Sequence, residues 1–451
     1  MNQGLISRLI ASGRGAGLRA QLLRGGVGVG ALKLISLPLT LAASILLARS
    51  LGPEGFGQYA FVIALITTLS IPLAPALMQL MTRETAVMHQ AGELGRVRAL
   101  LRWGNRHVLL GSALILVGVG GIASWNAEWQ IDDRWTLVLL SLAALPLLGL
   151  NAIRAGVLAG LRRVVIGQFP DLLIRPLVLL LIVGVLFIGG LLTPLTAVAA
   201  FIAGGAAALV VGAVILKRAF PASENVLPPK DEAQNKQWVR AWLPFTLLVA
   251  ASTLNAQIGI LLLGWFSTDD QVAAMQVAER GAMLVVLSLT VVNLVIGPHI
   301  TQVHKTGDRV QLQNLSRYSA RMALLVALPI AVPLIFFGAP ILAFVFGEEY
   351  AEIATLPLAI LAIGQVINVT FGSVGMLLTM SGFERDTLLG QVLALLVNAI
   401  AAVLMVPFLG AVGAALATAI GLIIWNAVLA LLVFRRLSVV PSPFSFGKKA
   451  S

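Results

Sequence analysis

The residue types that could perform covalent chemistry are scarce in this chain of 451 residues. Cysteine is absent, which excludes disulfides, a thiol nucleophile and cysteine-based metal sites. The four histidines, His89, His107, His299 and His304, are too scattered for a zinc site, so we expect no metal and no cofactor. No phosphate-binding loop of the GxxxxGK(S/T) type is present, which argues against ATP hydrolysis. The sequence predicts a protein that is not an enzyme.

Charged residues inside long apolar segments are the main candidates for function, because a charge in a membrane is costly. Lys33 follows the glycine-rich stretch GGVGVG and either snorkels to the membrane interface or faces a cavity and attracts a diphosphate. Asp171 and Arg175 are four residues apart and can share one helix face. They form either a structural ion pair or a site in which Arg175 binds substrate and Asp171 tunes it or takes up a proton.

Arg49, Arg280 and Arg83 stand at the ends of apolar segments. Arg49 and Arg280 lie at ends where basic residues are otherwise rare, so they either pair with nearby acids or hold and release a diphosphate at an outer mouth. The nearby acids are Glu54, Glu279, Asp269 and Asp270. Arg83 is either an ordinary topogenic charge or a residue that recruits substrate. Arginine suits phosphate because its planar fork makes two hydrogen bonds and stays charged. We expect Lys33, Arg49, Arg175 and Arg280 to line one central cavity.

The elements that must position these residues are membrane helices. Hydrophobic residues make up 59% of the chain and charged residues 11%, too few to cover a soluble protein of this size. Runs of about 20 apolar residues can each cross the membrane as a helix. Twelve such spans are predicted, at 26–49, 58–81, 107–125, 135–153, 168–189, 195–216, 242–266, 281–302, 322–346, 354–379, 387–408 and 411–433. The predicted fold class is all-α, a polytopic membrane protein.

The net charge of +12 would suggest nucleic acid in a soluble protein, but its distribution indicates membrane topology. With both termini in the cytoplasm and twelve crossings, 26 of the 31 basic residues fall on the inner side. Ten of the 19 acidic residues fall outside. We therefore expect no nucleic-acid partner. Asp171 is the one carboxylate in a predicted span.

The predicted domains follow the longest polar stretch between spans, which divides the helices six and six. They are a cytoplasmic arm (1–25), an N-terminal six-helix bundle (26–216), a cytoplasmic linker (217–241), a C-terminal six-helix bundle (242–433) and a cytoplasmic tail (434–451). Amides inside the spans, such as Asn151, Asn255, Asn368, Asn398 and Asn426, are expected to cross-link helices or to contact sugar hydroxyls.

Three motifs resemble the polysaccharide flippases of the multidrug/oligosaccharidyl-lipid/polysaccharide exporter superfamily. They are ILLARSLGPEGFGQYAFV (45–62), FVFGEEYAEIATLPLAIL (344–361) and VNAIAAVLMVPFLGAVGAALATAIG (397–421). The resemblance implies two six-helix bundles around a central cavity. It also implies that alternating access moves an undecaprenyl-diphosphate-linked oligosaccharide, such as an O-antigen, capsule or exopolysaccharide repeat unit, across the bacterial inner membrane.

Two other functions are weighed against this flippase. A multidrug or organic-cation antiporter of the same superfamily would need an acidic, aromatic site, which the sequence does not favour. The other is a non-transporting scaffold of a polysaccharide assembly complex. Loss of function on replacement of Arg49, Arg175 or Arg280 by Ala, with normal expression and partners retained, would count against a scaffold. The expected partners are the lipid-linked oligosaccharide, membrane lipids and other polysaccharide assembly proteins.

Overall fold

The computed structural model describes residues 18–125, 133–220 and 232–443. Most of the predicted arm, the middle of the predicted linker and the end of the predicted tail lie outside these described residues. The helices are α2 (Leu18–Leu69), α3 (Pro75–Gln90), α4 (Leu94–Trp125), α5 (Asp133–Ser141), α6 (Ala144–Gly160), α7 (Val164–Phe169), the π-helix η1 (Pro170–Ile174), α8 (Arg175–Ile188), α9 (Pro194–Ala219), α10 (Glu232–Phe266), α11 (Asp269–Thr306), α12 (Arg309–Phe336), α13 (Gly338–Val345), α14 (Glu348–Phe371), α15 (Val374–Met380) and α16 (Glu384–Leu437).

The all-α membrane fold is confirmed: among the described residues, ten helices or joined helices are long and apolar enough to cross a membrane. The segment Glu384–Leu437 holds two predicted spans, and Gly28–Leu69 holds one span and the first part of the next, 58–81, whose end lies in α3. Gly52 in α2 has φ 66° and Gly410 in α16 has φ 53°, and each divides its long helix into two legs. Only glycine adopts such angles without strain. The arrangement is therefore consistent with the twelve predicted spans.

Several helices extend beyond the predicted spans, because charged turns continue the helix instead of ending it. α4 begins at Leu94 and carries the basic residues that the sequence assigns to a loop before position 107. α11 begins at Asp269, after Thr268 in an extended conformation, and not at position 281. Its two leading acids suit the first turn of a helix, where the helix dipole is positive.

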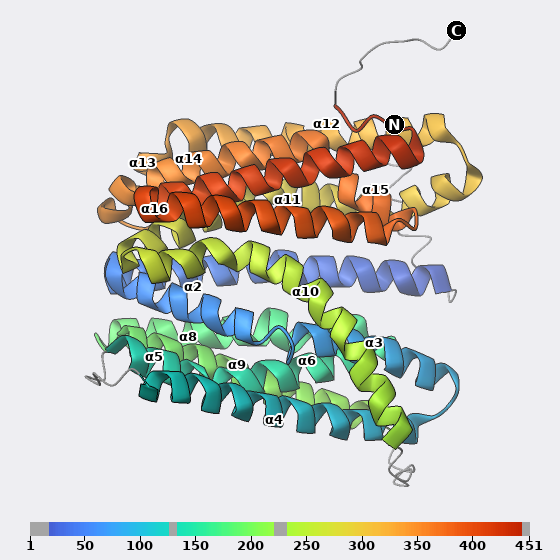
Figure 1. The fold of residues 1–451 in the computed structure, drawn as a ribbon, viewed down its shortest axis with the longest axis horizontal. Coiled ribbons are helices and arrows are strands. Elements are labelled where there is room, and N and C mark those ends of the chain that lie inside the picture. The colour runs from blue at the N-terminus through green and yellow to red at the C-terminus, as the bar shows by residue number, and fades with distance from the viewer. Residues whose placement is uncertain (1–17, 126–132, 221–231, 444–451) are drawn as a thin grey trace. The chain divides into compact units, whose positions relative to one another are not determined.

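The chain forms two compact units that interleave along the sequence. Unit 1 takes Met1–Ser44 and Leu69–Val249, and unit 2 takes Ile45–Thr68 and Ala250–Ser451. Helix α2 therefore contributes to both. In unit 1, α6 packs against α3, α4 and α9, and α8 packs against α9 (Figure 1). A fully buried cluster at one end includes Leu77, Leu80, Val97, Leu100 and Ile153.

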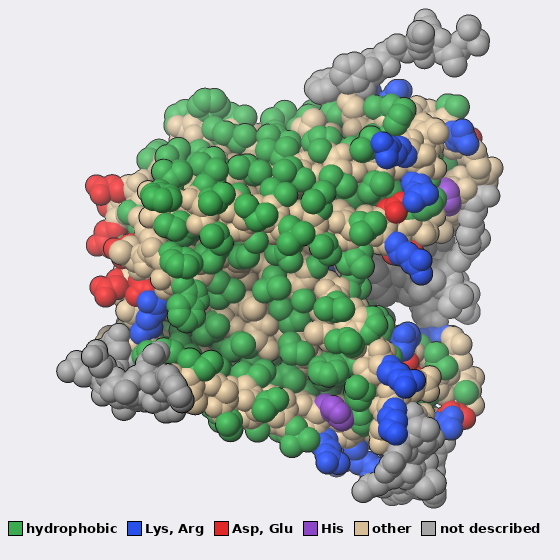
Figure 2. Space-filling model, viewed as in Figure 1, with side chains coloured by type: hydrophobic (Ala, Val, Ile, Leu, Met, Phe, Trp, Pro, Cys, Tyr) green, Lys and Arg blue, Asp and Glu red, His purple; other side chains and the backbone are tan. Residues whose placement is uncertain are grey.

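In unit 2, α14 packs against α11, α12 and α16. The two legs of α16 turn at Gly410 and approach closely at Gly421, where a Cβ would lie 2.9 Å from Asn398 Cβ. A second buried cluster joins α11, α15 and the end of α16 through Ile300, Leu377 and Val433. Over the helices of unit 2, acidic side chains gather at one end and basic side chains at the other (Figure 2). This separation of basic and acidic side chains is what the positive-inside rule predicts for a membrane protein.

Candidate functional site

The first candidate site lies in unit 1, where two prolines produce a π-turn in the fifth predicted span. Pro170 and Pro176 have no N–H to donate to the preceding turn. The backbone N–H of Arg175 donates to the carbonyl of Pro170, five residues earlier, so that Pro170–Ile174 forms a π-helix between α7 and α8. Single π-helical turns inside α-helices are frequent at functional sites. Here the turn carries Asp171 and Arg175.

Asp171 and Arg175 form the predicted ion pair, with Arg175 Nη2 2.9 Å from Asp171 Oδ1. Their side chains are 28% and 22% exposed, so neither lies on an open surface. The guanidinium also lies over the ring of Phe201 on α9, 5.8 Å from its centroid. Arg175 Nε is buried and has no hydrogen-bond partner among the described residues. The pairing thus leaves Nε as a buried donor that no described residue satisfies.

Arg154 is a second cation beside this turn. The predicted span 135–153 ends just before it, but Arg154 lies inside α6 and is half buried. Its Nη1 donates to the carbonyl of Leu150 at 2.7 Å, so the charge is partly satisfied within its own helix. A Cβ at Gly212 on α9 would lie 3.7 Å from both Arg154 Cδ and Pro170 Cγ. The apolar, small-residue stretch AGVLAG after Arg154 was the missed signal that the helix continues.

Lys33 and Arg83, also in unit 1, are both exposed. Arg83 forms an ion pair with Glu84 at 2.7 Å, and its guanidinium lies 5.2 Å from the ring centroid of Phe245. Its side chain remains 51% exposed, so the pair is an exposed one of little energetic value. Lys33 lies on α2, and the Ser36 hydroxyl donates to its backbone carbonyl at 2.9 Å.

Arg49, in unit 2, binds backbone rather than an acidic side chain. Its Nε donates to the carbonyl of Val345 at 2.9 Å and its Nη2 donates to the carbonyl of Phe344. These carbonyls end α13, where a cation also complements the helix dipole. Nearby, the buried hydroxyl of Tyr350 donates to the carbonyl of Ala48 at 3.0 Å. Arg49 and Tyr350 therefore join the part of α2 that belongs to unit 2 to the α13–α14 junction.

Arg280 lies in α11, half buried, one residue after Glu279. With the Gln276 amide oriented so that its oxygen faces the guanidinium, this oxygen accepts from Arg280 Nη2 at 3.0 Å and from Nε at 3.2 Å. Because α11 begins at Asp269, Glu279 also lies within a candidate span. That Asp171 is the one carboxylate inside the membrane stays a prediction.

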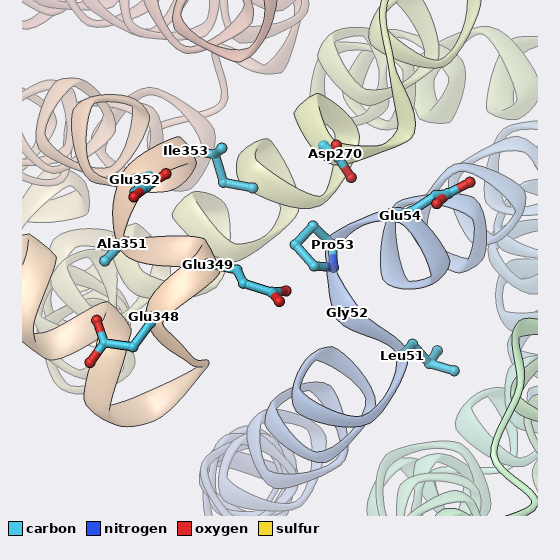
Figure 3. A pocket seen from close by; sticks show the side chains of 10 residues that line it. All are labelled: Leu51, Gly52, Pro53, Glu54, Asp270, Glu348, Glu349, Ala351, Glu352 and Ile353. Carbon is cyan, nitrogen blue, oxygen red and sulfur yellow. The ribbon is translucent and has the colours of Figure 1, made fainter.

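A pocket of about 690 Å³ opens at the acidic end of unit 2. Figure 3 shows Glu349 pointing from the start of α14 toward the turn at Gly52 and Pro53, with Asp270 opposite on α11. Five carboxylates line the pocket: Glu54, Asp270, Glu348, Glu349 and Glu352. Neither Arg49 nor Arg280 is among its lining residues. A concentration of negative charge of this kind repels anions.

The amides inside the helices cross-link them, as predicted for most. Asn151 Nδ2 donates to the carbonyl of Gly205 at 3.0 Å in unit 1. In unit 2, Asn398 Nδ2 donates to both oxygens of Asn255, and Asn426 Nδ2 donates to Asn368 Oδ1 at 3.0 Å. Hydrogen bonds between helices satisfy amides that lipid cannot.

The predicted site residues are thus divided between the two units. Lys33, Arg83, Asp171 and Arg175 belong to unit 1, and Arg49 and Arg280 to unit 2. Within unit 1 the π-turn brings Asp171 and Arg175 together and adds Arg154. That Lys33, Arg49, Arg175 and Arg280 line one cavity stays a prediction.

Solved structures of membrane transporters share this fold. An inward-facing multidrug resistance MATE family transporter of the MOP superfamily matches with a TM-score of 0.72 at 14% identity, over 91% of this chain and 98% of that one. The lipid II flippase MurJ, in an inward closed conformation, matches with a TM-score of 0.65 at 15% identity, over 89% of this chain and 86% of that one. At these identities the likeness shows the fold alone.

Sequence comparison is more specific. The chain is 30% identical over 165 residues to the probable low-salt glycan biosynthesis flippase Agl15 of Haloferax volcanii, which is 36% of this chain. The match spans about a third (34%) of that curated relative. These relatives are named as transporters or flippases, in agreement with the expectation that the chain is not an enzyme. The model of the polysaccharide biosynthesis protein family matches residues 22–304, more than half of the chain. The chain is a multi-pass membrane protein that belongs to the polysaccharide biosynthesis protein family.

Proposed function

We propose that the protein is a flippase that moves an undecaprenyl-diphosphate-linked oligosaccharide across the bacterial inner membrane by alternating access. The oligosaccharide would be an O-antigen, capsule or exopolysaccharide repeat unit. The observation that carries the proposal is the family match over residues 22–304 of a chain built from membrane helices. The name of the partial relative, a glycan biosynthesis flippase, supports it.

Arg175 is the residue that we propose binds the diphosphate. A guanidinium has five N–H donors in a fixed fork, and Nε of Arg175 has no hydrogen-bond partner among the described residues. A phosphate oxygen would replace Asp171 as the partner of Arg175 Nη2. After the substrate is released, Asp171 would pair with Nη2 again. Asp171 is also the proposed coupling acid, since it would lose its counter-charge whenever substrate occupies Arg175. Arg154, on the neighbouring helix, adds positive charge to the same region.

The remaining predicted cations receive separate roles. Lys33 and Arg83 are exposed and would attract or recruit the diphosphate. The Gln276 amide holds the guanidinium of Arg280 in position. We propose that Arg280 assists the binding or release of the diphosphate at the outer mouth. A direct contact between Arg49 and the substrate has less support, because the guanidinium already donates to the backbone carbonyls of Phe344 and Val345.

We propose that both termini are cytoplasmic and that the acidic end of unit 2 faces outward. The positive-inside rule supports this orientation. The five carboxylates of the acidic pocket would also disfavour the return of a released diphosphate. Other polysaccharide assembly proteins are proposed partners in the same pathway.

The test is reconstitution of purified protein in liposomes that carry a lipid-linked oligosaccharide on one leaflet. Appearance of the oligosaccharide on the other leaflet is measured with a membrane-impermeant glycosidase or lectin. We expect transfer to depend on the protein and on the diphosphate. If deletion of the gene left the exposure of lipid-linked repeat units at its normal rate in cells, the proposal would fail.

A second candidate, an organic-cation antiporter, is favoured by two specific observations. The acidic pocket offers five carboxylates, and Glu279 adds a further acid on α11. Carboxylates attract cations. Proton- or sodium-dependent efflux of a cationic dye by the reconstituted protein, with no transfer of the lipid-linked oligosaccharide, would favour this candidate over the flippase.

A further inference from the structure

Helix α4 carries two arginines that the proposed transport mechanism does not use. Arg102 and Arg106 are exposed and make no hydrogen bond or ion pair to any residue that the structure describes. They are four residues apart and so lie one above the other on the same face of the helix. A pair of unpartnered cations on one face raises the question of what neutralises them.

The face that carries these arginines continues as the most exposed apolar surface of α4. Leu110, Leu114 and Val117, one turn apart, are 57%, 73% and 71% exposed. The opposite face packs into unit 1 through Val97, Leu100 and Val108, each 0% exposed. In the most hydrophobic stretch of this helix, only 11% of the residues are buried. An exposed leucine–valine stripe on a membrane helix faces lipid tails.

The length of the helix places the arginines at the level of the lipid headgroups. From Arg106 to the end of α4 at Trp125 is 19 residues, or roughly 28 Å at 1.5 Å per residue. This length is close to the roughly 30 Å thickness of the hydrocarbon core. When the apolar stripe lies in the lipid tails, Arg106 lies at the boundary and Arg102 one turn beyond it. In Figure 2, blue basic side chains gather at the end of unit 1 where α4 begins, and green hydrophobic side chains lie farther along its course.

We propose that Arg102 and Arg106 form a binding site for an anionic phospholipid on the lipid-facing surface of unit 1. The two guanidinium groups would bind the phosphate and the anionic headgroup, while the acyl chains lie along Leu110, Leu114 and Val117. Charge complementarity selects this occupant, because zwitterionic lipids offer the site no net negative charge. The site is independent of the Asp171–Arg175 turn and does not rest on the proposed function.

Native mass spectrometry of the full chain in nanodiscs of phosphatidylglycerol and phosphatidylcholine tests this site. The double variant R102Q/R106Q should retain phosphatidylglycerol about 30-fold less tightly, which corresponds to about 2 kcal/mol for two arginines. The charge-retaining variant R102K/R106K should keep most of the binding. The matched control is R162Q/R163Q, which removes two exposed arginines from the turn before α7.

The outcomes separate a site from general attraction. Selective loss of phosphatidylglycerol in R102Q/R106Q, with little change in the control, supports the proposal. Equal loss in both double variants, no loss in either, or parallel loss of phosphatidylcholine would overturn it. A thermal unfolding midpoint within a few degrees of the unmodified chain confirms that the variants fold.

Discussion

Arg175 and Arg49 are two arginines of the membrane region with opposite surroundings. Arg175 sits in a π-turn, pairs with one acid four residues away and keeps a buried Nε without a partner. Arg49 donates from two nitrogens to the carbonyls that end α13. An arginine among membrane helices is therefore a candidate substrate-binding residue only where some of its N–H donors have no protein partner. Where backbone carbonyls accept from these donors, the arginine joins helices.

The end of unit 2 that holds Arg49 should be more sensitive to an added methyl group than the exposed part of α4 around Gly118. A Cβ at Gly57 would overlap the backbone carbonyl of Asp269, which cannot move without shifting α11. We expect Gly57→Ala to destabilise the protein by about 3 kcal/mol, the upper range for overpacking. Thermal unfolding in detergent measures this. Gly118→Ala, where a Cβ meets open space, is the control, and equal stability of the two variants would refute the close packing.

Loss of Arg175 should damage transport more than stability. If the guanidinium binds the diphosphate, Arg175→Gln removes a charged hydrogen bond of about 2 kcal/mol, or about a 30-fold loss of transport rate. Flipping into liposomes, normalised to folded protein, measures this loss. Normal transport by Arg175→Gln would mean that the ion pair is structural.

Loss of Arg49 should show the reverse pattern. Arg49→Gln removes two charge-assisted bonds to α13, and we expect a loss of about 1.5 kcal/mol of stability, reduced by the exposure of the side chain. Transport per folded molecule should stay close to normal. Arg49→Lys should recover part of the stability because the ammonium can reach one carbonyl. A transport defect without a stability defect would assign Arg49 to the substrate.

Asp171 offers the smallest and most specific effect. If it competes with phosphate for Arg175, then Asp171→Asn should raise the affinity for a soluble isoprenyl diphosphate about 5-fold, since an ion pair of this kind is worth about 1 kcal/mol. Competition binding to purified protein measures the change. A fall in affinity would instead indicate that Asp171 holds Arg175 in position.

What the sequence could predict in these two regions followed from spacing. The separation of Asp171 and Arg175 by four residues predicted their pairing, and the apolar runs predicted the helices. The predicted span stops before Arg154 because a charged residue lowers the hydropathy. The helix nevertheless continues through Arg154, whose guanidinium donates to the carbonyl of Leu150 in the same helix. The partners of Arg49 lie 295 and 296 residues away, and no local pattern can indicate them. Pro170 and Pro176 flank the ion pair in the sequence and permit an irregular helix end there, but they do not by themselves specify a π-turn.

The absence of cysteine allows the central comparison to be tested in one experiment. Arg175→Cys and Arg49→Cys are each treated with a methanethiosulfonate that carries either a trimethylammonium or a sulfonate group, and oligosaccharide transfer is then measured. We predict that positive charge restores transport at position 175 and negative charge does not, with no such difference at position 49. Equal responses to both reagents at position 175, or charge-dependent rescue only at position 49, would contradict the account.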